Sequence, residues 1–171
     1  MRNAFQRRLS LWLRLNAPFL MCFFLLVVGM IPWRLEFISH FAVPFVYIPL
    51  FYWTVFKPDL VSPLTVFLLG LCADLLTISP LGYHTFLFLL FYWVVLMERR
   101  AFMKRSFLFL WLVFGAFTTA LSLFQWLLAS LLNLRWLSLL FFTGQGLLLF
   151  ACFPVLAFVC AWVYQRYLDE V

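Results

Sequence analysis

The chain has 171 residues, of which 67% are hydrophobic and 11% are charged, whereas an ordinary soluble domain is ~45–50% apolar and ~25% charged. A soluble protein of this size cannot bury so much apolar surface, so the composition excludes a soluble enzyme, a nucleic-acid-binding domain and a disordered tail. We therefore expect an integral membrane protein, in which the net charge of +6 orients the chain in the bilayer.

The first 16 residues form a basic segment ahead of the first long apolar run. The segment carries Arg2, Arg7, Arg8 and Arg14, no acidic residue, and apolar side chains at helical spacing between the arginines. This pattern predicts a short interfacial amphipathic helix on the anionic inner surface of the membrane. A signal peptide shows a similar order of basic and apolar residues, but no small-x-small cleavage site follows, so we expect the segment to be retained.

The rest of the chain divides into six apolar segments. A helix needs ~20 apolar residues to cross the hydrocarbon core, so the chain has room for six spans and no soluble domain. Ser62-Pro63 and Ser79-Pro80 bound the third and fourth segments, because serine caps helices and proline favours the first helical position. We predict an all-α integral membrane protein, a compact bundle of six transmembrane helices in a single polytopic domain over 1–171, with spans at 17–33, 37–56, 63–78, 80–97, 106–132 and 136–164.

The distribution of basic residues predicts the orientation of these spans. If the N-terminus is cytoplasmic and all six segments cross, only Arg34 and Arg135 of the 12 Lys and Arg residues fall outside. A five-span chain would place Arg166 outside and would fuse two segments that proline separates. Since basic residues concentrate on the cytoplasmic side, we predict a multi-pass protein with both termini in the cytoplasm.

Cysteine and histidine form no recognisable catalytic or metal-binding pattern. His40 and His84 fall near the outer ends of their predicted helices without an adjacent catalytic partner, so we expect interfacial hydrogen bonding. The cysteines lack CxxC spacing and neighbouring metal ligands. We therefore expect them to be small buried hydrophobic residues that bind no metal or cofactor. They are Cys22, Cys72, Cys152 and Cys160.

Asp74 is the acidic residue that falls inside a predicted span, where burying a carboxylate is costly. At ~1.5 Å per residue from Pro63 it lies ~16 Å along the helix, closer to the outer face than to the middle of the membrane. We expect its carboxylate to accept hydrogen bonds from the free N–H groups at the start of the fourth helix and so close a tight hairpin. Contact with a partner protein or a ligand is the alternative.

An enzyme is disfavoured, because an intramembrane aspartyl protease needs two carboxylates in one site. A transport protein would need polar side chains between its helices. Small residues such as Gly115 and Thr119, one helical turn apart, instead favour close helix packing, and Pro154 is placed to bend the sixth span. The polar candidates for a small-solute pocket are Thr77, Thr118, Thr119, Ser122, Gln125, Thr143 and Gln145.

The segment from Pro44 to Thr85 carries a pattern of proline, glycine and aromatic residues around Asp74. It comprises Pro44, Tyr47, Phe51-Tyr52-Trp53, Lys57-Pro58, Pro63, Phe67, Gly70-Leu71, Asp74-Leu75 and Pro80-Leu81-Gly82. The pattern is similar to the signature of the rod shape-determining protein MreD family, whose members also resemble this chain in length and in having several spans. The chain departs from the family at Ile78, where members often carry glycine.

The resemblance implies a non-catalytic scaffold of the cell-elongation machinery in the bacterial inner membrane, which maintains rod shape by assembling peptidoglycan-synthesis partners. The implied partners are an MreC-like single-span periplasmic protein, an MreB-like actin homologue, and RodA and penicillin-binding wall synthases. The family is also similar in fold to the substrate-binding membrane subunits of vitamin transporters. A small-solute-binding subunit of a transporter is therefore the alternative function.

The resemblance and the residue pattern together select a set of structural or partner-binding residues. We expect the Gly70/Asp74 face of the third span and the turn at 79–82 to be the most sensitive surface. The set consists of Pro44, Tyr47, Pro58, Pro63, Gly70, Asp74, Pro80, Leu81 and Gly82.

Overall fold

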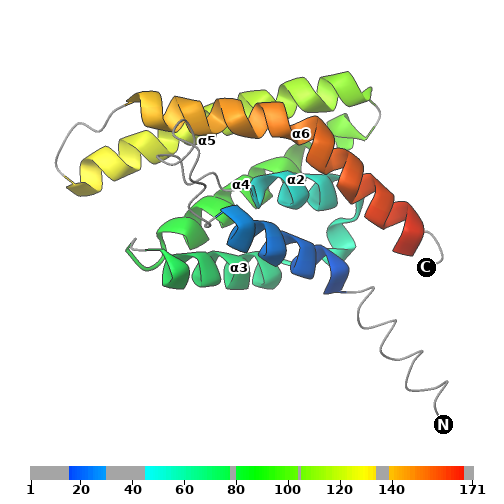
Figure 1. Ribbon diagram of the computed structural model, residues 1–171, viewed down its shortest axis with the longest axis horizontal. Coiled ribbons are helices and arrows are strands. Elements are labelled where there is room, and N and C mark those ends of the chain that lie inside the picture. The colour runs from blue at the N-terminus through cyan, green and yellow to red at the C-terminus, as the bar shows by residue number, and fades with distance from the viewer. Residues whose placement is uncertain (1–15, 30–44, 78–79, 104, 134–138, 168–171) are drawn as a thin grey trace, which may run out of the picture.

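The computed structural model describes residues 16–29, 45–77, 80–103, 105–133 and 139–167, and the regular structure in these ranges is entirely helical (Figure 1). The prediction of an all-α protein is confirmed for this part of the chain. The elements are the helix Asn16–Gly29, α2 (Tyr47–Phe56), the 3-10 turn η1 (Pro58–Leu60), α3 (Pro63–Leu76), α4 (Tyr83–Phe102), α5 (Phe107–Asn133) and α6 (Leu139–Tyr167).

Two of the helices, α5 and α6, contain segments long and apolar enough to cross a membrane, at Phe107–Leu131 and Thr143–Arg166. α4 has 20 residues, and its last turn carries Arg99 and Arg100. The helix Asn16–Gly29, α2 and α3 are apolar but shorter than the ~20 residues that a span requires. The six-span topology therefore stays a prediction.

Several sequence predictions fall outside the described residues. These are the amphipathic segment up to residue 15, the end of the first and the start of the second predicted span with His40 and Pro44, the pair Ile78-Ser79, and the start of the sixth predicted span at 136–138. Arg34 and Arg135, the two basic residues predicted to lie outside, are also among them. The second predicted span is described from residue 45 onward, where it forms α2.

The start of α3 follows the local rule that predicted it. Pro63 occupies the first turn, and the backbone N–H of Thr65 donates to Oγ of Ser62 at 3.3 Å. Proline at this position loses no helical hydrogen bond, and the serine satisfies one of the free N–H groups. The Ser-Pro signal thus places the helix start correctly.

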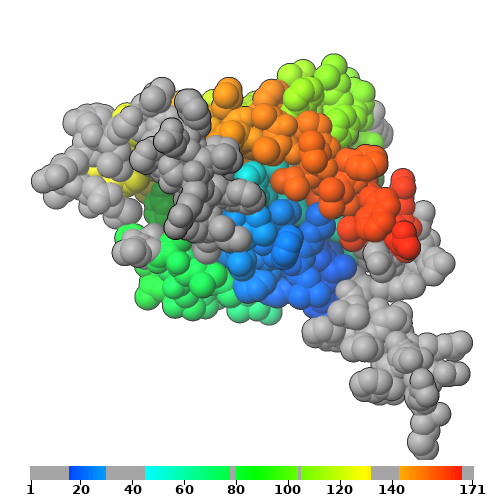
Figure 2. All heavy atoms as spheres, viewed as in Figure 1, coloured from blue at the N-terminus to red at the C-terminus, as the bar shows by residue number. Residues whose placement is uncertain are grey.

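α2 is the central helix of the fold, although it has only 10 residues. Eight of them are buried, from Tyr47 to Val55, and the helix packs against α4 and α6. In Figure 2 little of α2 is visible between α6 and the helix Asn16–Gly29. A helix this short is stabilised by its packing rather than by its own hydrogen bonds.

The other helices are arranged around α2 and α4. α5 and α6 pack against each other on one side, and α3 packs against α4 on the other (Figure 1). The ring of Phe51 on α2 contacts the rings of Phe91, Phe114 and Phe153, with centroids 6.4, 5.3 and 5.9 Å away. These edge-on and tilted contacts join α2, α4, α5 and α6 in one core.

The outer faces of the bundle are apolar as well. In an 18-residue apolar stretch within each of α5 and α6, only 28% of the residues are buried. Leu75 on α3, Leu131 on α5 and Phe158 on α6 are at least 70% exposed. Large apolar surfaces of this kind suit hydrocarbon rather than water, in agreement with the composition of the chain.

Candidate functional site at the turn between α3 and α4

A tight turn at residues 80–83 leads into α4. The N–H of Tyr83 donates to the carbonyl of Pro80 at 3.1 Å, and Gly82 has a left-handed backbone with φ of +94°. The prediction that the fourth helix begins at Pro80 is therefore wrong, since α4 begins at Tyr83. A left-handed residue cannot continue a right-handed helix, so Gly82 precedes α4 as its N-cap while Pro80 and Leu81 stay in the turn.

The carboxylate of Asp74 holds this turn to the end of α3. Its Oδ2 accepts hydrogen bonds from the N–H of Gly82 at 2.9 Å, from the N–H of Thr85 at 3.3 Å and from the hydroxyl of Thr85 at 2.7 Å. Its Oδ1 accepts one from the N–H of His84 at 2.7 Å. Because Asp74 is only 2% exposed, these donors take the place of water. The expected hydrogen bonds between Asp74 and the start of the fourth helix are present.

The sequence analysis missed His84 and Thr85 as members of this site. Nδ1 of His84 lies 3.1 Å from Oδ1 of Asp74 and 3.4 Å from Oγ1 of Thr77. His84 has no acidic neighbour in sequence, and it meets Asp74 only because the chain reverses between them. The Pro-Leu-Gly turn was the available signal, since a reversal there places the residues after Gly82 opposite the last turn of α3.

Gly70 allows α3 and α4 to come into close contact one helical turn before Asp74. A Cβ at position 70 would lie 2.9 Å from the backbone nitrogen of Thr85 and still closer to its Cα. Gly70 and Asp74 are both buried. Their face of α3 is thus an internal contact with α4, which corrects our expectation of a surface there.

The remaining motif residues within the described ranges lie in α2, in η1, at the start of α3 and in the turn itself. Tyr47 is buried at the start of α2, and its hydroxyl accepts a hydrogen bond from Nε2 of Gln125 at 3.1 Å. Pro58 begins η1 and Pro63 begins α3. Leu81 lies in the turn and is 73% exposed. Leu81 is therefore a large apolar side chain that the hairpin presents openly to its surroundings.

The polar residues of α5 support close helix packing. The hydroxyls of Thr118, Thr119 and Ser122 donate to carbonyls one turn earlier in the same helix, at 3.0, 2.8 and 2.7 Å. Gly115 lies against the ring of Phe150 on α6. These contacts satisfy the hydroxyls within the helix, although a groove of about 340 Å³ also runs between α5 and α6 beside Thr119 and Ser122.

The described residues contain no group of three His, Cys, Asp or Glu side chains that would hold a metal ion. All four cysteines are free thiols, with Cys22 and Cys160 buried and Cys72 and Cys152 partly buried. The expected burial is thus confirmed for Cys22 and Cys160 and is only partial for Cys72 and Cys152.

Replacing Gly82 by alanine is expected to destabilise the turn through its backbone alone. Nothing lies within 4 Å of the position that a Cβ would take, so crowding adds no penalty. A left-handed conformation costs an L-residue about 1–2 kcal/mol, and asparagine tolerates it better than alanine. The melting temperature in detergent should therefore fall for Gly82→Ala and fall less for Gly82→Asn. Equal melting temperatures for all three proteins would contradict this explanation.

Comparison with known proteins identifies one family. The model of the family described as rod shape-determining protein MreD matches residues 11–167. This range contains the α3–α4 turn and extends far beyond the motif segment, through α5 and α6. The resemblance noted in the sequence is thus confirmed. Searches of curated proteins and of solved structures found no match.

Proposed function

The chain belongs to the MreD family of rod shape-determining proteins, and on this premise we propose that it is a non-catalytic scaffold of cell elongation in the bacterial inner membrane. The observation that carries the proposal is the family match over residues 11–167, which gives the chain a role in rod-shape determination. The match favours this role over a small-solute-binding subunit. In the proposed role the protein holds peptidoglycan-synthesis partners together and transforms no substrate.

The proposed topology has six spans with both termini in the cytoplasm. Nε of Arg99 donates to the carbonyl of Val55 at 3.0 Å, and Nζ of Lys57 lies 5.6 Å from the ring centre of Tyr164. The C-terminal ends of α2, α4 and α6 thus meet at one end of the bundle, together with these basic residues. Alternating spans with a positive cytoplasmic side require such an arrangement, and the α3–α4 turn then faces the periplasm.

The hydrogen bonds of Asp74 support a structural role for this residue in the scaffold. Both carboxylate oxygens accept hydrogen bonds from N–H groups at the start of α4, so the carboxylate stabilises the hairpin. The tip of the hairpin then presents Leu81, which is 73% exposed, in a fixed position. We propose that this tip contacts the MreC-like single-span periplasmic partner.

The other proposed partners would meet different parts of the bundle. RodA-type and penicillin-binding synthases would pack against the exposed apolar faces of α3, α5 and α6, where association in lipid depends on close contact. An MreB-like actin homologue would approach the basic end at Lys57 and Arg99, which the proposed topology places in the cytoplasm.

Cell shape and partner recovery test this function together. Cells that lack the protein should become round while solute uptake continues, and the wild-type gene should restore rods. Leu81→Ser should keep the melting temperature of the wild type but reduce recovery of the single-span partner in a pull-down about tenfold or more, as loss of an apolar anchor does. Leu64→Ser is the matched control, because Leu64 is 66% exposed on α3 at the other end of the hairpin.

The outcomes separate the parts of the proposal. Rod-shaped cells without the protein would exclude the scaffold function. Round cells together with full partner recovery by Leu81→Ser would retain the scaffold and exclude the hairpin tip as its docking surface. Loss of solute uptake without a change of shape would favour the transporter subunit.

A further inference from the structure

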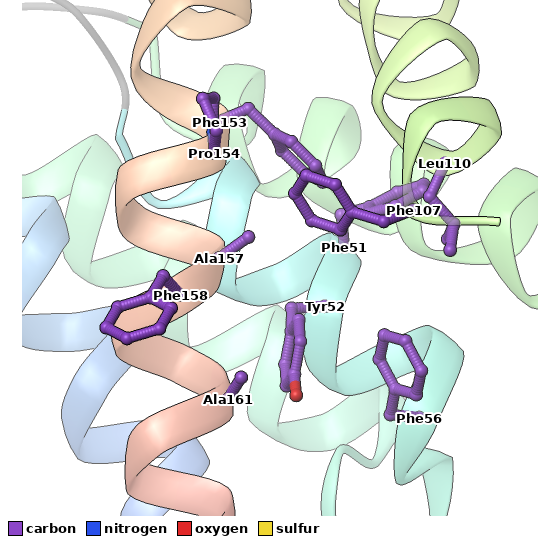
Figure 3. A pocket seen from close by; sticks show the side chains of 10 residues that line it. All are labelled: Phe51, Tyr52, Phe56, Phe107, Leu110, Phe153, Pro154, Ala157, Phe158 and Ala161. Carbon is purple, nitrogen blue, oxygen red and sulfur yellow. The ribbon is translucent and has the colours of Figure 1, made fainter.

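An apolar groove opens where α2, the start of α5 and the second half of α6 meet, at a distance from the α3–α4 hairpin (Figure 3). Its volume is about 410 Å³, and Tyr52 is the lining residue that carries a polar side-chain atom. Phe56, Phe107 and Phe158 line the groove and are exposed, so it reaches the surface of the bundle. A concave site with this lining suits an apolar ligand.

The shape of α6 creates the space. α6 changes direction along its length (Figure 1), and Pro154 inside the helix removes a backbone hydrogen bond, which is the usual cause of a bend. Beyond Pro154, Ala157 and Ala161 lie one helical turn apart and line the groove across from Tyr52 and Phe56 (Figure 3). Two small side chains opposite aromatic rings leave a narrow channel that suits a flexible, unbranched hydrocarbon chain.

Basic residues lie in the chain segments that border this groove. Lys57 directly follows Phe56, Arg105 comes shortly before Phe107, and Arg166 is in the last turn of α6. Within the described ranges none of the three forms an ion pair, and each lies over an aromatic ring instead. Their charges are therefore not neutralised by carboxylates of the described residues, which leaves them available to an anionic group.

We propose that the groove binds one anionic phospholipid, with an acyl chain between α2 and α6 and the phosphate among the basic residues at the mouth. An apolar channel whose bordering chain segments carry unneutralised cations is complementary to a molecule with a hydrocarbon chain and a negative headgroup. The proposed topology places these cations on the inner side of the membrane, so the ligand is a lipid of the inner leaflet. This site is separate from the hairpin and needs no protein partner.

Native mass spectrometry of the full-length protein in detergent tests the proposal, with phosphatidylglycerol and phosphatidylcholine as the added lipids. We expect one phosphatidylglycerol to bind. Phosphatidylcholine should bind at least about fivefold more weakly, because its headgroup has no net negative charge to interact with the basic residues. Ala161→Phe should weaken phosphatidylglycerol binding about tenfold, because the ring fills the channel. Val155→Phe is the matched control, since Val155 is 67% exposed on α6 and does not line the groove.

Charge variants keep the test valid if Ala161→Phe fails to fold. Lys57→Gln should weaken phosphatidylglycerol about fivefold and leave phosphatidylcholine unchanged. Arg100→Gln, which removes the same charge from an exposed site at the end of α4, should leave both unchanged. Equal effects of Lys57→Gln and Arg100→Gln would overturn the proposal. A photo-crosslinker at position 52, in the lining of the groove on α2, that captures a polypeptide instead of lipid in native membranes would overturn it as well.

Discussion

Replacing Asp74 by alanine is expected to destabilise the protein by about 3 kcal/mol or more, because each buried donor left without an acceptor costs ~1–3 kcal/mol. Three backbone N–H groups and the hydroxyl of Thr85 donate to this carboxylate, and it is 2% exposed, so water cannot replace it. We expect a lower melting temperature in detergent, reduced accumulation in the membrane and rounded cells. Thermal unfolding of the purified variant, together with the ratio of cell length to width, measures these effects.

Two further variants separate the acceptor from the charge. Asp74→Asn retains one side-chain oxygen as an acceptor, so its melting temperature should lie between those of the wild type and Asp74→Ala. Asp59→Ala removes an exposed carboxylate of η1 and should change little. If Asp74→Ala has the melting temperature of the wild type and supports rod shape equally well, then the carboxylate does not hold the hairpin.

Gly70→Ala is expected to destabilise the protein by about 1–3 kcal/mol, the range for an overpacked core. The added Cβ would meet the backbone of Thr85, and backbone atoms cannot turn aside as a flexible side chain can. α3 and α4 must then separate, which also lengthens the hydrogen bonds of Asp74 to the start of α4. The melting temperature in detergent and the accumulation of the variant in membranes measure the effect.

Gly146→Ala provides the matched control on α6. Its Cβ would meet Oγ of Ser122 at 3.0 Å and otherwise lie at ordinary contact distance, so a small shift of one side chain accommodates it. We therefore expect a clearly smaller loss of stability than for Gly70→Ala. Equal losses would mean that the contact between α3 and α4 is no tighter than that between α5 and α6.

The hairpin shows how far local sequence reasoning reaches. Ser62-Pro63 predicted the start of α3 because the cap and the proline act within one helical turn. Asp74 was predicted to bind the start of the next helix because a carboxylate in an apolar segment needs donors, and a helix start supplies free N–H groups nearby. The exact start of α4 was missed, because the left-handed conformation of Gly82 belongs to the folded turn.

The sequence by itself indicated a membrane protein, the helical nature of the described residues and the contact of Asp74 with the start of the next helix, because hydropathy, caps and the cost of a buried charge act over a few neighbouring residues. The tertiary structure alone decided that α2 lies at the centre, that His84 and Thr85 join Asp74, and that a groove opens beside Ala157 and Ala161. These features depend on how whole helices are placed against one another. Nearly every face of this chain is apolar, so hydropathy does not distinguish a side chain in the core from one that faces lipid.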